Sequence, residues 1–237
     1  MLCFPISHQT FRMRDAAPAE KGGIMNYQVF LTDMFKASGQ TLTIFFSTLL
    51  FSLPLGLVVA MGRMSKFAVI RLPVRLYILI MRGTPLMLQL MFVFYALPRI
   101  VGIQFGRMPS AIIAFSLNYA AYFAEIYRGG IEAMPAGQYE AAQVLGLTRG
   151  QTFFRIILPQ VVKHILPPMG NEFITLVKDT SLAQTIVIFE IMKITERYAS
   201  STVSVAPFVV AALFYLVMNG IVSQCFSFAE KKLNYYR

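Results

Sequence analysis

Long apolar stretches separated by short polar segments run along most of this 237-residue chain. No charged residue occurs between Lys36 and Arg63, and residues 41–61 form an apolar run of the length that crosses a bilayer. Four further apolar stretches follow, at residues 84–98, 108–124, 166–189 and 206–229. The pattern therefore predicts an all-α integral membrane protein with five transmembrane helices.

One long segment, residues 129–164, is too charged to cross a membrane and is predicted to lie outside it. Five spans place the two termini on opposite sides. The loops 63–82 and 128–164, with the C-terminal tail, hold twelve Lys and Arg residues, whereas the opposite side holds eight. Because cytoplasmic loops are enriched in basic residues, we expect segment 129–164 and the C-terminus in the cytoplasm and the N-terminus outside.

Composition agrees with a membrane location and excludes several other classes. The chain is 57% hydrophobic and only 14% charged, against about a quarter charged in soluble domains. Its 21 basic and 11 acidic residues are explained by the cytoplasmic loops, so we do not expect nucleic-acid binding. The two cysteines, Cys3 and Cys225, form neither a disulfide framework nor a metal-ligand spacing.

The first 24 residues lack the apolar core of a signal peptide. We expect them to be a disordered tail or to result from an over-long start, with Met25 as the natural beginning. Under either interpretation, residues 25–237 form one membrane domain.

Within segment 129–164, the residues predict two short helices joined by a tight corner. Residues 138–145 contain helix-forming residues, and Gly146 is expected to end that helix. Thr148 and Gln151 have the spacing of a capping box, which predicts a second helix ending at Pro159. Taken alone, this hairpin is equally compatible with packing beneath its own membrane domain and with binding another protein.

The same hairpin resembles the EAA loop of permease subunits of ABC importers. That pattern is Glu-Ala-Ala, three residues, Gly, nine residues, Ile, one residue and Leu-Pro. Every position is met here, by Glu140, Ala141, Ala142, Gly146, Ile156, Leu158 and Pro159. Four further segments are similar to the branch of that family that imports histidine, glutamine, arginine and cystine: RGTPLMLQL (82–90), NYAAYFAEIYRGGI (118–131), PAGQYEAA (135–142) and NEFITLVKDTSLA (171–183).

The resemblance covers about residues 27–232 and implies a MetI-like transmembrane fold. It implies that the loop docks on an ATP-binding subunit, with Leu147 and Arg149 joining the seven matched residues in the docking surface. The chain has no Gly-rich phosphate loop, so it is expected to be a non-catalytic subunit without a cofactor of its own. ATP and Mg are then bound by the partner.

The other implied partners follow from the same family. They are two copies of the ATP-binding subunit, a substrate-binding protein outside the cytoplasm, and either a second copy of this chain or a paralogue. The implied substrate is a polar L-amino acid of unspecified identity. The implied location is the bacterial cytoplasmic (inner) membrane, which the chain crosses several times.

The fourth predicted span carries an unusual set of polar residues. At about 100° per residue, the set falls within about 140° of one helix face. Its members are Asn171, Glu172, Thr175, Lys178, Asp179 and Thr185. Because ionisable groups in a membrane are costly, this face is expected to meet protein or water rather than lipid. It either lines the substrate path or locks two spans together through a pair such as Lys178 with Asp179.

Several other polar residues are weaker candidates for that path, namely Asn118, Glu125, Thr180 and Ser181. Glu125 and Arg128 are three residues apart and are expected to form an ion pair at the cytoplasmic end of the third span. Arg82 begins the second span, where an arginine is expected to be an interfacial anchor rather than a ligand.

An ion channel or a self-sufficient secondary transporter is the alternative interpretation. Such a protein would work alone, whereas the EAA pattern predicts that this chain copurifies with an ATPase and is inert without it. Copurification therefore discriminates between the two.

Overall fold

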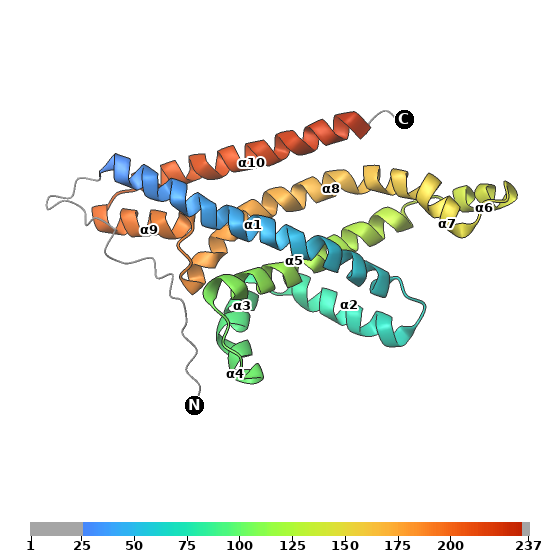
Figure 1. Cartoon of the computed structure of the whole chain (residues 1–237), viewed down its shortest axis with the longest axis horizontal. Helices are drawn as coiled ribbons and strands as arrows, with labels where there is room; N and C mark the ends of the chain where they lie inside the picture. The colour runs from blue at the N-terminus through green and yellow to red at the C-terminus, as the bar shows by residue number, and fades with distance from the viewer. Residues whose placement is uncertain (1–25, 234–237) are drawn as a thin grey trace.

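The computed structural model describes residues 26–233, and the expectations about residues 1–24 lie outside this range. Within it no residue belongs to a strand, so the described part of the chain is entirely helical (Figure 1). The helices are α1 (Tyr27–Arg63), α2 (Ala68–Gly83), α3 (Leu86–Met91), α4 (Leu97–Val101), α5 (Arg107–Glu132), α6 (Ala136–Val144), α7 (Arg149–Thr152), α8 (Leu158–Asp179), α9 (Ile191–Thr202) and α10 (Ala206–Leu233).

Three short segments of unusual helix connect these elements. Phe92–Ala96 and Phe153–Ile157 are π-helical, and Thr180–Ile186 is a 3₁₀ helix that ends at Val187 in the left-handed conformation. Such segments occur where a helix changes direction or hydrogen-bond register.

The long helices α1, α5, α8 and α10 run side by side, and α9 lies at the end opposite α6 and α7 (Figure 1). By length and composition, α1 and α10 qualify as membrane spans. Helix α2 together with α3–α4 would form a third, bent by 108° at its break. The spans expected at 108–124 and 166–189 fall on α5 and α8, and crossing by these two helices remains a prediction.

The second predicted span, 84–98, corresponds to contiguous helix formed by α3, the π-helical turn and α4. Two expectations about element boundaries are wrong. Residues 63–82 are not simply a loop, because helix α2 occupies most of that range. The fourth predicted span does not run from 166 to 189, because α8 begins at Leu158 and ends at Asp179.

Helix α2 was not predicted from the sequence because its arginines interrupt the apolar run. At about 100° per residue, Arg71, Arg75 and Arg82 fall within about 40° of one another. The remaining positions are almost all apolar, and one side packs on α1 and α5. A stripe of arginines on a single face is compatible with a helix, although it interrupts an apolar run in the sequence.

Helix α5 occupies the centre of the bundle and packs on α1, α2, α3 and α8. Its buried residues include many alanines, which let neighbouring helices approach closely. It approaches the backbone of α1 closely at Gly56. A Cβ atom added there would lie 2.9 Å from the Cβ of Phe123 and 3.1 Å from the backbone oxygen of Ala120. The two helices therefore pack nearly backbone to backbone.

At the opposite end from α6 and α7, helix α9 is fixed to α1 and α10. Glu190 is fully buried and caps α9, accepting hydrogen bonds from the backbone N–H groups of Met192 and Lys193, each at 2.8 Å. Its carboxylate also accepts from the hydroxyl of Tyr215 on α10 at 3.0 Å. Tyr198 donates to Asp33 on α1 at 2.7 Å. These contacts tie the short helix to two long ones.

The contact at Gly56 leads to a test of the α1–α5 packing. Replacing Gly56 with Ala should lower the stability of the protein by about 1–3 kcal/mol, because backbone atoms cannot yield to the added methyl group. The matched control is Gly39→Ala on the same helix, where the new methyl meets nothing within 4 Å. Thermal unfolding of the purified membrane complex should show a lower Tm for the first variant only, and equal Tm values would contradict this packing.

Candidate functional site

The hairpin between α5 and α8 has a sharply defined corner. Gly146 has a φ of 73°, in the left-handed region that glycine adopts without strain. The N–H of Leu147 then bonds back to the carbonyl of Ala142 at 3.0 Å, which satisfies an open carbonyl at the end of α6. Gly146 thus ends the first helix, as its position in the sequence indicates.

The second helix starts with the capping box that the sequence predicts. The N–H of Gln151 donates to the hydroxyl oxygen of Thr148 at 3.3 Å, and the N–H of Thr148 donates to the side chain of Gln151 at 2.9 Å. The prediction that this helix ends at Pro159 is wrong. The π-helical turn shifts the hydrogen-bond register just before Pro159, so the chain continues directly into α8. The hairpin is therefore a rigid extension of α8.

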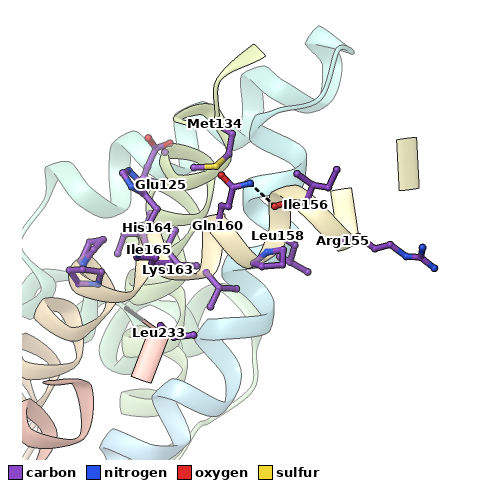
Figure 2. Close-up of a pocket in the computed structure, with 17 residues that line it drawn as sticks. Glu125, Met134, Arg155, Ile156, Leu158, Gln160, Lys163, His164, Ile165 and Leu233 are labelled. Atoms are coloured by element: carbon purple, nitrogen blue, oxygen red, sulfur yellow. Dashed lines mark hydrogen bonds between the residues drawn. The ribbon is translucent and has the colours of Figure 1, made fainter. Parts of the chain in front are cut away.

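A reciprocal amide pair holds the two arms of the hairpin together. Gln138 on α6 and Gln160 on α8 each donate to the other at 2.8 Å. Gln160 also donates to the carbonyl of Ile156 at 2.8 Å, which fixes its orientation (Figure 2). The pair therefore links α6 to the start of α8.

The matched loop residues differ in exposure. Ala142 is buried, whereas Leu147, Ile156 and Leu158 are partly buried, so these four help to pack the hairpin. The surface is formed by Glu140, Ala141, Gly146, Arg149 and Pro159.

Sequence reasoning missed three apolar residues on the same surface. Val144 and Leu145 at the corner are 88% and 76% exposed, and Phe154 is 68% exposed. Their position within a charged segment predicted to lie outside the bilayer could have identified them as surface residues. Apolar side chains grouped on such a surface indicate an interaction site.

A cavity of about 1460 Å³ lies where the hairpin joins the bundle, between the ends of α5 and α10 and the start of α8 (Figure 2). Glu125, Lys163 and His164 line it, and the side chain of Arg155 points away from it. Helices α5 and α8 approach closely at its wall, where a Cβ at Gly130 would overlap Ile165.

A cluster of ion pairs marks the end of α5, just beyond the expected span 108–124. The carboxylate of Glu125 lies 2.6 Å from Arg128 and 3.6 Å from Arg63, and Arg128 also pairs with Glu132. Burial alone would raise the pKa of Glu125, but Arg128, aided by Arg63 and Arg82, lowers it below its ordinary value. The expected pair between positions 125 and 128 is confirmed within α5, and the contact of Glu125 with Arg63 joins α5 to α1.

The polar residues of α8 share one helix only as far as Asp179. Thr185 belongs to the following 3₁₀ helix, so the prediction that it continues the stripe is wrong. The Thr185 hydroxyl donates to the backbone carbonyl of Leu182. Asn171 and Lys178 are exposed, whereas Glu172, Thr175 and Ser181 are partly buried. Thr180 is fully buried and donates to the carbonyl of Val177.

Asp179 is bound to α5 rather than to its neighbour Lys178. The buried hydroxyl of Tyr119 donates to the Asp179 carboxylate at 2.8 Å. Lys178 forms no ion pair with Asp179 among the interactions of the described residues and acts on it only through its charge. The expected pair between Lys178 and Asp179 is therefore replaced by a hydrogen bond between helices α5 and α8.

Asn118 on α5 braces the break between α2 and α3. Its amide group donates to the carbonyl of Met81 and to the side chain of Gln89, both at 2.9 Å. Gln89 in turn donates to the hydroxyl of Thr84 at 2.8 Å. Both N–H groups of the Asn118 amide are used within the protein, so its contribution to the site is positional.

Arg82 also faces α5. Its guanidinium carbon lies 5.1 Å from the centre of the Tyr122 ring, and its charge acts on Glu172 of α8. Tyr122 stands next to Tyr119, with ring centres 6.1 Å apart. Helix α5 thus contacts both Arg82 of α2 and Asp179 of α8, which lie far apart in the sequence.

The chain matches a family described as "Binding-protein-dependent transport system inner membrane component" over residues 52–235. It is 37% identical to the L-cystine transport system permease protein TcyB of Bacillus subtilis, over 79% of this chain and 80% of that protein. It is 38% identical to the octopine transport system permease protein OccM of Rhizobium radiobacter, over 85% and 87%, respectively. The arginine transport system permease protein ArtQ of Bacillus subtilis is 36% identical, over 81% and 89%.

Solved structures share the fold. A chain of an amino acid ABC transporter crystallised with histidines is 31% identical, with a TM-score of 0.76, covering 87% of this chain and 94% of that one. A chain of the inward-facing MetNI methionine ABC transporter has a TM-score of 0.68 at 16% identity, covering 89% and 99%. The second likeness shows the MetI-like fold alone.

The Glu125 ion pairs predict a stability difference that depends on pH. Glu125→Gln should lower stability at neutral pH by about 1–2 kcal/mol, because the charged hydrogen bonds from Arg128 and the ion pair with Arg63 are lost. A carboxylate with a lowered pKa stabilises the fold above its ordinary pKa of 4.5 and loses this contribution as pH falls further. The Tm difference from wild type should therefore be constant between pH 7 and 5.5 and decrease below 4.5.

The matched control is Glu132→Gln, which removes a more exposed partner of the same Arg128. Its effect on Tm should be smaller, since exposed pairs contribute little. Equal effects of the two substitutions would refute the importance of the Glu125 pairs.

Proposed function

Because the chain belongs to the family of binding-protein-dependent transport system inner membrane components, we propose that it is the permease subunit of an ATP-driven importer of polar amino acids. Relatives are permeases named for cystine, arginine and octopine transport. Solved transporter structures share the helical fold of this chain. Which amino acid this chain carries depends on a separate substrate-binding protein in such a system.

The observation that carries this proposal is the exposed surface of the hairpin. Val144 and Leu145 project from a corner that Gly146 and the Thr148 cap hold in one shape. Glu140 and Arg149 are exposed near it. An apolar centre with a charged rim is the composition of a protein interface. Its proposed partner is the ATP-binding subunit, which supplies ATP and Mg and catalyses hydrolysis.

The hairpin provides the mechanical link that coupling requires. Closure of two ATP-binding subunits on ATP would pull both hairpins, and α8 would follow because it is continuous with its hairpin. The membrane halves would then rock about a central site, as in alternating access. ATP can drive this change only if the two conformations bind the partner with different free energies.

The proposed topology has five spans in the bacterial inner membrane, with the N-terminus outside and the hairpin and C-terminus in the cytoplasm. A second copy of this chain or a paralogue completes the pathway. The amino acid passes along the α5–α8 face that contains Tyr119, Glu172 and Asp179. This placement is supported by the partly buried carboxylates on that face, because ionisable groups in membrane helices mark substrate paths.

A charge reversal tests the proposed docking surface. Glu140→Lys should reduce ATP-driven uptake in proteoliposomes by about tenfold, since a loss of about 1.4 kcal/mol in docking is a factor of ten in affinity. Pull-down of the ATP-binding subunit by this variant should weaken in parallel.

The control is Glu230→Lys, which makes the same charge change at an exposed position near the end of α10. Uptake should remain normal in this control. A chain that transports without any ATPase would overturn the proposal and favour a channel or a secondary transporter.

A second pair of variants tests the substrate path. Asp179→Asn keeps an acceptor for the Tyr119 hydroxyl and removes the charge, whereas Tyr119→Phe removes the hydrogen bond and keeps the charge. A role for the carboxylate in transport predicts that the first variant loses uptake by about tenfold or more with an unchanged Tm. A purely structural role predicts the larger Tm loss for Tyr119→Phe and equal uptake per folded complex.

A further inference from the structure

The cavity at the base of the hairpin combines basic and apolar lining residues (Figure 2). Along its α8 wall, Lys163 and His164 precede the apolar stretch that begins at residue 166, and Pro167 and Pro168 lie within that stretch. The two pairs are one helical turn apart, so the chemistry of this wall changes over about 5 Å. Such a wall fits a molecule that is itself polar at one end and apolar at the other.

The apolar lining comes from three helices. Ile126 on α5, Ile165 on α8 and Leu233 on α10 contribute to it beside the two prolines. Apolar side chains that surround an open volume mark a place where another molecule binds. The cavity of about 1460 Å³ also exceeds the roughly 300–1,000 Å³ of pockets for small ligands, so its shape favours a larger occupant.

The acidic residue among the described lining residues is Glu125, and its charge is already compensated. Arg128 lies 2.6 Å from its carboxylate, and Arg63 lies 3.6 Å from it. An anionic group elsewhere in the cavity therefore does not meet an uncompensated negative charge on this side chain.

Basic residues surround the same cavity. Lys163 and His164 line it, and Lys231 and Lys232 are exposed in the last turn of α10, directly before Leu233. Basic pockets between transmembrane helices on the cytoplasmic side bind anionic lipid headgroups. In the proposed topology this end of the bundle lies at the cytoplasmic leaflet.

We propose that the cavity binds an anionic phospholipid of the cytoplasmic leaflet, with its phosphate at Lys163 and His164 and its acyl chains against the apolar lining. A soluble phosphate compound would satisfy the basic residues and leave the apolar lining exposed. The inference goes beyond the proposed function and uses only its topology.

The bound lipid would stabilise the attachment of the hairpin. Gln160, which pairs with Gln138 of α6, lines the cavity, and so does Met134 at the start of the hairpin. A lipid in this position contacts the hairpin and the bundle together, and a ligand that binds the folded state raises its stability.

Thermal unfolding with added lipid tests the site. The Tm of the purified protein, with any subunits that copurify, is measured in detergent against increasing phosphatidylglycerol or phosphatidylcholine with the same acyl chains. Phosphatidylglycerol should raise Tm at concentrations about fivefold or more lower, because basic residues favour the anionic headgroup. Glycerol 3-phosphate, which lacks acyl chains, should have no effect over the same range.

A charge variant tests the headgroup contacts. Lys163→Gln combined with His164→Gln should abolish the preference for phosphatidylglycerol over phosphatidylcholine. The matched control is Lys66→Gln, which removes an exposed charge from the turn between α1 and α2, outside the cavity. This control should keep the full preference.

A second variant fills the cavity without changing its charge. Gly129 lines the cavity, and a Cβ atom added there meets nothing within 4 Å, so leucine should be accommodated with an unchanged Tm in the absence of lipid. Gly129→Leu should weaken the phosphatidylglycerol effect by about tenfold, since displacing two buried methylene groups costs about that factor. The control is Gly39→Leu on α1, an equally open position outside the cavity.

Three results would overturn the lipid site. They are equal responses to the two phospholipids, a response to glycerol 3-phosphate equal to that to phosphatidylglycerol, and a full phosphatidylglycerol response in either cavity variant. None of these measurements involves transport, so such a failure leaves the proposed function intact. Absence of ATP-driven amino acid uptake would refute the proposed function and leave the lipid site standing.

Discussion

The close contact of α1 with α5 is the constraint on which the rest of the structure depends. In a bilayer, apolar side chains gain little by leaving lipid, so helix association relies on close packing and on polar contacts. Gly56 and the alanines of α5 permit that packing, because their side chains are small and a methyl group at position 56 would lie too close to α5. Helices α2, α3 and α8 also pack on α5.

Helix α5 then joins the two functional regions. Its middle part carries Tyr119 and Tyr122, which contact Asp179 on α8 and Arg82 on α2. Its C-terminal end leads into the hairpin, and the hairpin continues into α8 without an intervening break. Helix α8 therefore connects the proposed docking surface with the polar face, as the proposed coupling of ATP hydrolysis to transport would require.

Local features were predictable from the sequence because they depend on neighbouring residues. The Gly146 corner, the Thr148 cap and the pair between Glu125 and Arg128 each need at most a few residues of context. Errors occurred where hydrogen-bond register or helix type changed. A proline normally ends a helix, but the π-helical turn before Pro159 removes the conflict, and no local residue pattern announces that turn.

The sequence by itself determined the membrane class, the apolar stretches and the hairpin, since hydropathy, charge and capping act over short distances. Only the tertiary structure decided which polar groups meet. It placed Arg82 beside Tyr122 and bound Asp179 to Tyr119, because two helices separated along the chain, α2 and α8, both pack on α5. Side-chain contacts between distant segments depend on helix rotation and close packing, and the period of a single helix specifies neither.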